Sequence, residues 1–570
     1  MSPAAGAASQ SSVARLPVVL LWHMHQPPYR DALDGQYVLP WTYLHAIKDY
    51  TDMAAHLEDN PAARAVVNFS PVLLEQLRDL SERLDAHLAE GAPLPDAVLA
   101  MLGPAPLPRE PAQRLALLRA CLRAHPQTMV QRFAPYQELV TLAATFASPE
   151  RIGYAADAFL HDLAVWYHLA WLGETVRRSE PLAPRLEARG RDFSAGERRE
   201  LLGLIARLVA TVVPRYRALA AAGRCELSVT PYAHPIVPLL LDFASSREAI
   251  PELPLPRHAR YAGGAERSAW HIVQGLKVFQ AAFGVRPAGC WPAEGAISTE
   301  TLRLLARLGE FRWAASGGAV GRASLGERTA ANPDSLHRPY RLEGTGMDCF
   351  FRDDGLSDLI GFTYATWHGD DTAHNLVEAL TRLATGYRDP SQHAVLIALD
   401  GENAWEHYPF NGYYFLRALY AQLAAHPLLE LTTLTQCLDR GLQPTPLPTV
   451  CAGSWVHGTL STWMGDAAKN AAWDLLCAAK ERCDECLPRL SPAQRSAALA
   501  QLALCEASDW FWWFGDYNPP EAVAQFDRLY RHQLQTLYRH LNVPAPLELD
   551  TPLAVGTGRP EHGGVMQRSG

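Results

Sequence analysis

Residues 16–27 read Leu16-Pro-Val-Val-Leu-Leu-Trp-His-Met-His-Gln-Pro27, and this stretch gives the first indication of the architecture. Its apolar half is typical of a parallel strand buried on both faces, and polar side chains follow where the strand ends. Helical segments separate this run from six similar ones, so the sequence predicts an α/β fold, a distorted (β/α)7 barrel. The seven predicted strands are Val18–Trp22, Ala65–Phe69, Glu226–Thr230, Pro287–Trp291, Phe311–Ser316, Met347–Arg352 and Ala394–Asp400.

Two long regions depart from the alternation of strands and helices. Between Phe69 and Glu226 about 150 residues have a helical pattern, far more than a crossover between parallel strands needs. After residue 420 the strand signal fades and amphipathic helices follow. The sequence therefore predicts a flexible N-terminus (1–15), a catalytic barrel (16–420) with a large helical insertion (about 72–222), a C-terminal helical domain (421–550) and a loose tail (551–570).

Several helices can be delimited from their ends. One is predicted from Ser268, which can cap its N-terminus, to Gly284, which can end it. Another is predicted from Ser298 or Thr299 to Gly309. The C-terminal domain is predicted to contain helices within Thr462–Lys480, Ala497–Glu506 and Glu521–Leu541.

Composition excludes several classes of protein. Of 570 residues, 48% are hydrophobic and 19% charged, which suits a large folded core and excludes general disorder. The net charge of −9 argues against a nucleic-acid partner, which normally selects a basic surface. No apolar run approaches the roughly 18 residues of a membrane span, and the N-terminal segment does not resemble a signal peptide. We therefore expect a cytoplasmic protein with neither nucleic-acid nor membrane partners.

The ten cysteines are scattered along the chain. Only Cys483 and Cys486 form a CxxC pair, and no second pair follows at the spacing of a zinc site. We therefore expect reduced thiols rather than a metal or redox centre.

Titratable and aromatic residues follow nearly every predicted strand. In α/β barrels the active site forms at the carboxyl ends of the strands, so these residues should meet at one rim. Glycoside hydrolysis needs two carboxyl groups that flank a cleft, and sugar rings stack on aromatic side chains. The candidate carboxyl groups are Glu294, Asp353, Asp354, Asp400, Glu402 and Glu406.

A metal-dependent hydrolase or deacetylase is the alternative of another class. His23-x-His25 at the end of the first strand resembles a zinc-binding pair. Such sites need further histidines late in the barrel, where Ser316 and Asp353 occur instead. The glycosidase interpretation is therefore the stronger one.

Five stretches in order resemble the motifs of glycoside hydrolase family 57. They are His25-Gln26-Pro27, Glu226-Leu-Ser-Val-Thr-Pro-Tyr-Ala-His234-Pro, Cys290-Trp-Pro-Ala-Glu294-Gly, Phe351-Arg-Asp353-Asp-Gly-Leu-Ser-Asp358-Leu-Ile-Gly-Phe and Asp400-Gly-Glu402-Asn-Ala-Trp405-Glu. The later stretches Ser461-Thr-Trp-Met-Gly-Asp466 and Ser508-Asp-Trp-Phe-Trp-Trp-Phe-Gly-Asp516 are similar to the amylopullulanase and α-amylase branch of that family.

The resemblance implies a (β/α)7 barrel whose C-terminal helical domain completes the cleft, and retaining hydrolysis of α-glucans. By position, Glu294 matches the nucleophile and Asp353 the general acid/base. Asp354 follows where this branch usually lacks an acidic residue, so Asp354 is the alternative acid. The expected substrate-binding residues are His23, His25, Gln26, His234, Trp291, Asp354, Asp400, Glu402, Trp405, Trp510 and Trp512.

The expected reaction cleaves α-1,4 and also α-1,6 glucosidic bonds of starch, glycogen or maltodextrins by double displacement. A 4-α-glucanotransferase or a branching enzyme on the same scaffold is the alternative. The mechanism needs no metal or organic cofactor. It does need a protonated Asp353 near neutral pH, and the neighbouring carboxylates Asp354, Asp400 and Glu294 could raise its pKa. The sequence does not indicate an oligomeric state.

Overall fold

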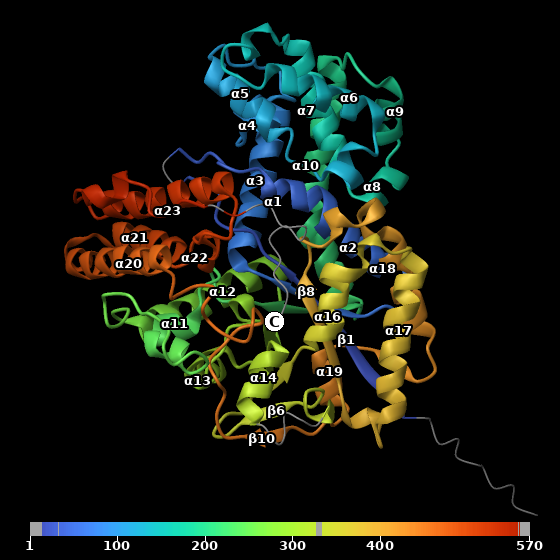
Figure 1. The fold of residues 1–570 in the computed structure, drawn as a ribbon, viewed down its shortest axis with the longest axis vertical. Helices are drawn as coiled ribbons and strands as arrows, with labels where there is room; N and C mark the ends of the chain where they lie inside the picture. Colours follow the sequence, from blue (N-terminus) through green and yellow to red (C-terminus); the bar gives the residue numbers. More distant parts are fainter. Residues whose placement is uncertain (1–13, 32–33, 327–332, 557, 559–570) are drawn as a thin grey trace, which may run out of the picture.

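The structure is a computed structural model that describes residues 14–31, 34–326, 333–556 and 558. Most of the predicted flexible N-terminus, and residues 557 and 559–570 of the predicted tail, lie outside this description. Parallel strands form the barrel in the order β8-β1-β2-β3-β4-β5-β7, which confirms the predicted (β/α)7 barrel (Figure 1). They are β1 (Leu16–Met24), β2 (Ala65–Phe69), β3 (Cys225–Val229), β4 (Gly289–Cys290), β5 (Trp313–Ser316), β7 (Asp348–Phe351) and β8 (Val395–Asp400).

The barrel is distorted where its last two strands meet. β1 pairs with β2 on one side and with β8 on the other along most of its length. Among the described residues, β7 meets β8 through a single parallel bridge between Arg352 and Leu396. Every residue of β1 is buried, as expected for a strand covered on both faces.

Three further strands were not indicated by the sequence pattern. β6 (Tyr340–Leu342) is antiparallel to β7, and β10 (Thr445–Leu447) extends the sheet beyond β6. β9 (Leu429–Leu431) pairs in parallel with the start of β1. Each has three residues, too few to show a periodicity. Because β9 and β10 lie after residue 420, the sheet extends beyond that position, and the domain boundaries stay a prediction.

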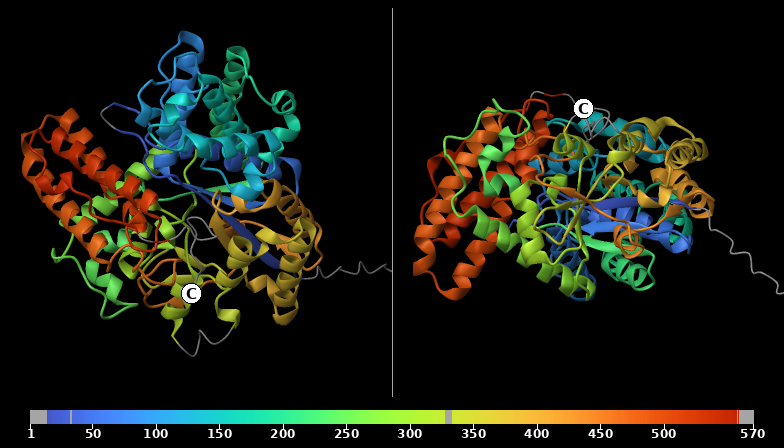
Figure 2. Two further views of the ribbon diagram at one scale, coloured as in Figure 1. Left: turned by 45° about the horizontal axis from the view of Figure 1, so that its top comes forward. Right: turned by 90° about the horizontal axis from the view of Figure 1, so that it is seen from below.

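The predicted helical insertion lies between the adjacent strands β2 and β3. It is the upper part of Figure 1, in blue to green, and Figure 2 shows it from two other directions. Its helices are α3 (Pro71–Glu90), α4 (Ala97–Ala100), α5 (Pro111–Ala120), α6 (Ala134–Ala143), α7 (Asp157–Ala170), α8 (Glu174–Ser179), α9 (Leu182–Arg189) and α10 (Ala195–Ala221).

Other helical segments connect the remaining strands. Between β1 and β2 lie α1 (Trp41–His45), the π-helix η1 (Ala46–Tyr50) and α2 (Thr51–Asp59). The others are α11 (Val237–Leu241), α12 (Gly264–Phe283), α13 (Thr299–Gly309), α14 (Gly318–Leu325), α16 (Asp354–Asp358), α17 (Gly369–Gly386), α18 (Tyr413–Ala425) and α19 (Leu434–Asp439).

The predicted cap of α12 is wrong, although its end at Gly284 is confirmed. The helix begins four residues before Ser268, after Gly263, whose φ of 64° suits glycine. A Cβ atom on Gly264 would lie 1.7 Å from the carbonyl oxygen of Leu240, so only glycine fits there. Ser268 is therefore a buried residue inside the helix.

The C-terminal helices lie beside the barrel, at the left of Figure 1 in orange and red, and Figure 2 agrees. They are α20 (Ala467–Cys486), α21 (Pro492–Cys505), α22 (Ser508–Trp513) and α23 (Pro520–His540). All ten cysteines are free, and Cys483 and Cys486 are buried in α20. Among the described residues, no helix combines the length and apolar character needed to cross a membrane.

Candidate active site

The strand register aligns polar residues at one rim of the barrel. His23 near the end of β1 lies opposite Asn68 of β2 and Asp400 of β8. Glu294 follows β4 in the short helix η6 (Ala293–Gly295). Because the strands are parallel, their carboxyl ends bring these side chains together, as the sequence predicted.

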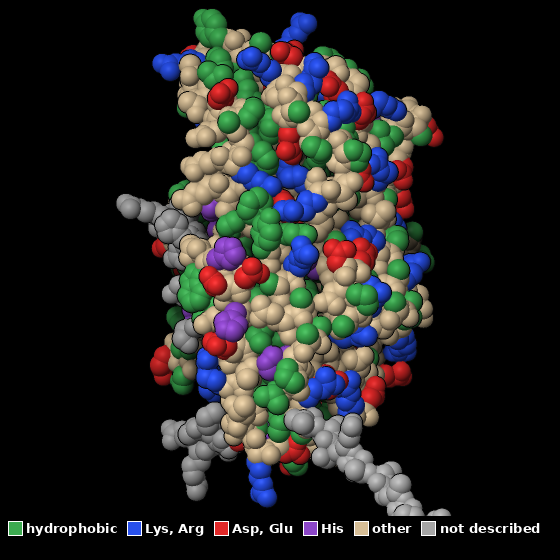
Figure 3. All heavy atoms as spheres, turned by 90° about the vertical axis from the view of Figure 1, so that its right-hand side faces the viewer, with side chains coloured by type: hydrophobic (Ala, Val, Ile, Leu, Met, Phe, Trp, Pro, Cys, Tyr) green, Lys and Arg blue, Asp and Glu red, His purple; other side chains and the backbone are tan. Residues whose placement is uncertain are grey.

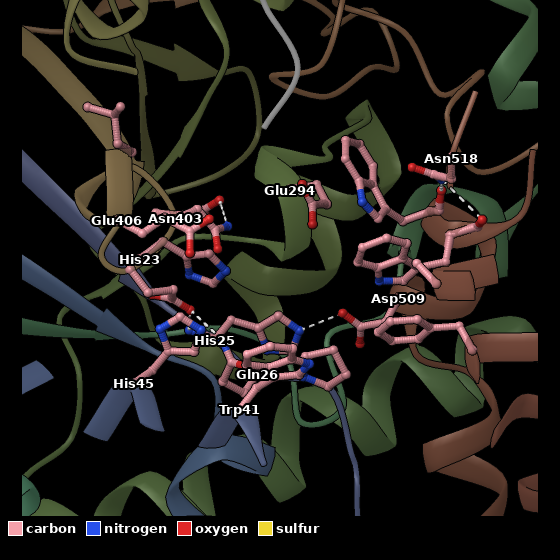
Figure 4. Close-up of a pocket in the computed structure, with 18 of the residues that line it drawn as sticks. His23, His25, Gln26, Trp41, His45, Glu294, Asn403, Glu406, Asp509 and Asn518 are labelled. Carbon is pink, nitrogen blue, oxygen red and sulfur yellow. Dashed lines mark hydrogen bonds and ion pairs between the residues drawn. The ribbon is translucent and has the colours of Figure 1, made fainter. Parts of the chain in front are cut away.

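A cavity of about 570 Å³ opens at this rim. Its walls come from the barrel, the helical insertion and the C-terminal helices, and Figure 4 shows part of its lining. The residues predicted for the site that line it are His23, His25, Gln26, Glu294, Asp400, Glu402 and Trp512.

The other predicted site residues lie behind this lining. Trp291 and Trp405 are fully buried, and Trp405 donates to the carbonyl of Gly401. Trp510 is also buried and packs against Tyr530, with ring centroids 5.9 Å apart. His234, Asp353 and Asp354 are also absent from the described lining, and their surroundings are given below.

Glu294 is held in an uncommon backbone conformation. Its φ is 56° and its ψ 23°, in the left-handed region that non-glycine residues seldom occupy. The indole Nε1 of Trp455 donates to Glu294 Oε2 at 2.8 Å, and the Trp455 N–H donates to the Glu294 carbonyl at 3.0 Å. The first bond holds the carboxyl group and the second holds the backbone, so the side chain is fixed at the cavity, where Figure 4 shows it. Such an outlier is a common sign of a functional residue.

The electrostatic surroundings of Glu294 favour its neutral form. Burial and the nearby Asp400 carboxylate raise the pKa of Glu294 to about 8, although the Trp455 hydrogen bond opposes the rise. Burial also raises the pKa of Asp400 to about 6, against the lowering effect of the Asn403 amide, which donates to Asp400 Oδ2 at 2.7 Å. Closely spaced carboxyl groups with raised pKa values are typical of active sites.

Glu402 is buried beside this pair. Its Oε1 accepts hydrogen bonds from the side chains of Gln26 and Tyr50, each at 3.1 Å, and from the His25 N–H. Burial and the charge of Asp400 raise the pKa of Glu402 well above its ordinary value. Within the described residues, its Oε2 has no hydrogen-bond partner.

Three histidines form a stack at the cavity. The rings of His25 and His234 lie 3.7 Å apart at 12°, and His23 lies 5.0 Å from His234. His23 Nδ1 is 2.6 Å from Asn68 Oδ1. Burial and the charge of His25 lower the pKa of His23 to about 3 and that of His234 well below its ordinary value. His23 and His234 are therefore neutral hydrogen-bonding groups at neutral pH.

Asp353 faces away from the lining of the cavity. Its Oδ1 accepts the Leu356 N–H at the start of α16, and its Oδ2 lies 2.9 Å from His337 Nε2. Burial raises the pKa of Asp353, but the hydrogen bond and charge of His337 outweigh it and leave the pKa below its ordinary value. The expected raised pKa is therefore not present in this conformation.

Asp354 is engaged by arginines. Arg352 Nε donates to Asp354 Oδ1 and Arg322 Nη2 to Oδ2, each at 2.9 Å. The Gly318 N–H donates to Oδ1 at 3.0 Å. A carboxylate with both oxygens bound in this way fixes local structure and is poorly placed to donate a proton.

Sequence reasoning missed several residues of the cavity. Trp455 lies after β10, in a segment without periodicity, and the glycines Gly453 and Gly458 around it were the available signal. Asp509 belongs to a quoted motif but was not singled out, and its Oδ1 lies 2.9 Å from His25 Nε2. The insertion and the C-terminal helices contribute further lining residues: Arg123, His125, Trp171, Trp513, Asn518, Glu521, Gln525 and Phe526.

One group of three described residues has a ligand set that could suit a metal ion. The side-chain ligand atoms of His25, His234 and Asp509 lie within 4.8 Å of one another. The two imidazoles are stacked, however, so their in-plane lone pairs lie in nearly parallel planes and do not converge on one ion. His234 Nδ1 and Nε2 also lie 2.8 Å from Ser508 Oγ and 3.0 Å from His23 Nε2. This geometry disfavours a shared metal ion.

The sequence profile of glycosyl hydrolase family 57 matches residues 19–447. A search of curated protein sequences gives no match.

Several solved structures share the fold. A family 57 branching enzyme from Thermococcus kodakaraensis is similar with 13% identity and a TM-score of 0.57, over 92% of this chain and 90% of its own. An α-amylase from Thermotoga maritima is similar with 13% identity and a TM-score of 0.56, over 94% and 95%. A 4-α-glucanotransferase from Thermococcus litoralis is similar with 13% identity and a TM-score of 0.51, over 92% and 60%. At these identities the likeness concerns the fold alone.

Proposed function

The chain belongs to glycosyl hydrolase family 57, and we propose that it hydrolyses α-1,4 and also α-1,6 glucosidic bonds of α-glucans with retention of configuration. The main support is the position of Glu294, whose carboxyl group is fixed by Trp455 in a cavity lined with histidines and aromatic rings. Neutral donors and acceptors beside aromatic faces suit an uncharged sugar. The similar structures described above are, by name, a branching enzyme, an α-amylase and a 4-α-glucanotransferase.

In the first step, Glu294 attacks the anomeric carbon and forms a covalent glycosyl–enzyme bond. The glycosidic C–O bond breaks, and the leaving oxygen takes a proton from Asp353. In the second step, a water molecule attacks the same carbon and gives its proton to Asp353, while Glu294 leaves as a carboxylate. His25 and Asp400, which line the cavity, hold the sugar unit during both steps, and His234 supports the His25 ring from behind the lining.

We assign the proton transfer to Asp353 rather than to Asp354. Two arginines occupy both oxygens of Asp354, so its carboxyl group is held in local structure. Among the described residues, the side-chain partner of Asp353 is His337. In its catalytic role, Asp353 has to turn from His337 toward the cavity and carry a proton.

Transfer to a second glucan, as in a 4-α-glucanotransferase or a branching enzyme, is the alternative that the cavity shape favours. Aromatic rings line it on two sides, with Trp171 from the insertion and Trp512 and Trp513 from the C-terminal part. Two such surfaces could hold a donor and an acceptor chain. The first step is the same in both reactions, and only the group that attacks the glycosyl–enzyme differs.

Chromatography of the products from maltoheptaose and pullulan separates these activities. Shorter maltooligosaccharides alone indicate hydrolysis, longer ones indicate transfer, and cleavage of pullulan at its α-1,6 links indicates the second bond type. Glu294→Gln should abolish turnover of both substrates. Asp353→Asn should retain the first step on an aryl glycoside with an acidic leaving group, and azide should restore its turnover with retained configuration.

The assignment of the acid is contradicted if azide rescues Asp354→Asn while Asp353→Asn stays inactive. Stoichiometric zinc in the purified protein, with activity lost on chelation, would support the metal-dependent alternative instead.

A further inference from the structure

Three exposed aromatic side chains lie outside the cavity, on the face that contains α8, α17 and α18. Trp367 is 43% exposed, Phe410 38% and Tyr414 45%. We call these three residues the aromatic strip. Figure 3 views this side of the molecule, where hydrophobic side chains in green lie next to basic ones in blue.

The members of the strip are neighbours in space. The rings of Phe410 and Tyr414 are perpendicular, with centroids 5.4 Å apart. Trp367 lies close to them, because Gly369, two residues further on, packs against Tyr414: a Cβ atom on Gly369 would lie 2.9 Å from Tyr414 Cβ. The strip is therefore one surface feature rather than three scattered rings, which would need no explanation.

A buried carboxylate fixes the arginines around the strip. Glu174 is only 3% exposed and accepts hydrogen bonds from Arg132 at 2.8 Å and Arg178 at 2.9 Å. The Arg132 guanidinium lies over the Phe410 ring at 4.6 Å. Arg178 donates to the Tyr414 hydroxyl at 3.0 Å. The guanidinium groups are thus held in place before any ligand arrives.

A second buried carboxylate fixes the loop that presents Phe410. Asp52 Oδ2 accepts hydrogen bonds from the Asn411 side chain at 2.9 Å and from the Glu174 N–H at 2.7 Å. Phe410 and Asn411 have φ values of 55° and 54°, in the left-handed region. Two successive non-glycine residues in this region are uncommon, and here they leave a large apolar ring at the surface.

Short segments of the chain connect the strip to residues of the catalytic cavity. Phe362 lines the cavity, and five residues later Trp367 lies on the surface. Glu406 also lines the cavity, and Phe410 follows four residues later on the surface. Two separate segments of the chain therefore run from the cavity to the strip.

We propose that the aromatic strip is a second binding site for an α-glucan chain, outside the cavity, which holds polymeric substrate near the catalytic rim. The inference rests on the proposed action on α-glucans. The apolar C–H faces of glucosyl units stack on Trp367, Phe410 and Tyr414. The Arg178 guanidinium and the Tyr414 hydroxyl supply hydrogen-bonding groups for the sugar hydroxyls. An uncharged polymer is the fitting ligand, because the exposed surface of the strip consists of aromatic rings and its arginines are already engaged by Glu174, Phe410 and Tyr414.

Affinity electrophoresis in gels that contain glycogen tests binding without turnover. Glu294→Gln serves as the background, and Trp367→Ala with Tyr414→Ala is added to it. We expect the apparent Kd for glycogen to rise about fivefold to tenfold, as for the loss of a few stacking contacts. The matched control is Tyr154→Ala, which removes an aromatic ring of the helical insertion that is 84% exposed and does not belong to the strip. This substitution should leave the Kd unchanged.

A second measurement uses the active enzyme, in which Glu294 is unchanged and the same two aromatic residues are replaced. The double variant should lose more kcat/KM on glycogen than on maltoheptaose, which is short enough to bind in the cavity alone. Trp367→Ala by itself should change the melting temperature little, because that side chain is 43% exposed and its described ring contact is with Tyr364.

An unchanged Kd for glycogen, or equal losses of kcat/KM on both substrates, would overturn the proposal. A change from dimer to monomer in light scattering, without a change in glycogen binding, would instead identify the strip as a contact between copies of the chain. Failure of the proposed function has a different signature, because the wild type would then leave maltoheptaose uncleaved whatever the strip binds.

Discussion

His25 and Asp509 are 484 residues apart in sequence, yet His25 Nε2 and Asp509 Oδ1 lie 2.9 Å apart at the wall of the cavity. His25 follows β1 of the barrel, and Asp509 belongs to α22 near the C-terminus. Within the described residues, Asp509 Oδ2 has no hydrogen-bond partner. The cavity therefore forms only when the two ends of the chain are folded together.

The pH dependence of Asp353→Asn should report the ionisation of Glu294. Only ionised Glu294 can attack, and its pKa is raised to about 8, so formation of the glycosyl–enzyme from an activated aryl glycoside should increase as the pH rises through about 8. Stopped-flow release of the aryl group between pH 5 and pH 9.5 measures this rate. A rate that is constant over this range would mean that Glu294 is already ionised at pH 5.

Removal of the Trp455 indole should make Glu294 a poorer nucleophile at neutral pH. Trp455→Phe deletes the hydrogen bond to Oε2, which favours the carboxylate, so the pKa of Glu294 should rise further. A hydrogen bond to a charged group contributes about 1.5–3 kcal/mol, and we expect kcat at pH 7 to fall about tenfold or more. The control Trp512→Phe changes another indole of the cavity that does not donate to Glu294. Equal effects of the two substitutions would argue against a specific role of the hydrogen bond.

The tryptophans of α22 should separate into packing and binding roles. Trp510 is fully buried against Tyr530, so Trp510→Ala should lower the free energy of unfolding by about 3–5 kcal/mol. Trp512 is partly exposed and lines the cavity, so Trp512→Ala should mainly raise KM for polysaccharide. Denaturant unfolding and kinetics on amylose and a short aryl glycoside measure both effects. A larger loss of stability in Trp512→Ala than in Trp510→Ala would contradict this division.

Glu506 should be important for stability. It is buried and accepts hydrogen bonds from Arg267 at 2.7 Å and 2.8 Å and contacts His271, so Glu506→Gln should cost about 3–5 kcal/mol by leaving a buried arginine unpaired. The control Glu300→Gln breaks an exposed pair with Arg303 and should cost at most about 1 kcal/mol. Denaturant unfolding at pH 7 compares the two, and similar values would contradict the prediction.

The stabilisation that Glu506 provides should decrease at low pH. Burial opposes ionisation of Glu506, but Arg267 and His271 outweigh it and lower its pKa to about 2, below the ordinary 4.5. The stabilisation is therefore present above about pH 4.5 and is lost as the pH falls toward 2. The difference in unfolding free energy between wild type and Glu506→Gln should shrink over this interval.

The barrel could be predicted because its strands are buried on both faces and so read as apolar runs. The rim could be predicted because parallel strands end on one side, which placed Glu294 and Asp400 together. The three-residue strands β6, β9 and β10 could not be predicted, because their pairing depends on strands that are distant in sequence. The start of α12 was missed because the close approach of Gly264 to Leu240 is a tertiary constraint.

The direction of the Asp353 side chain could also not be predicted from the sequence. Position at a strand end predicts the rim but not the rotamer, and His337, 16 residues earlier, attracts the carboxylate in this structure. Trp455 was missed for a related reason. Its hydrogen bond to Glu294 joins residues 161 positions apart, and the glycines Gly453 and Gly458 near Trp455 do not indicate which residue it contacts.

Among the described residues, one backbone bridge, between Arg352 and Leu396, closes the ring of strands, and we call this closure the clasp. Side-chain hydrogen bonds of Arg352 and Ser357 to the backbone of Ala398 support it. Asp353 directly follows Arg352, and its N–H donates to the Leu396 carbonyl at 2.7 Å, so the proposed proton donor lies on the clasp itself. Amide hydrogens there have few neighbouring bonds to protect them and should exchange with solvent before those of β1 and β8. Small openings of the clasp would move Asp353 relative to Glu294, which follows β4. The clasp is therefore the place in the barrel where the donor can change its orientation.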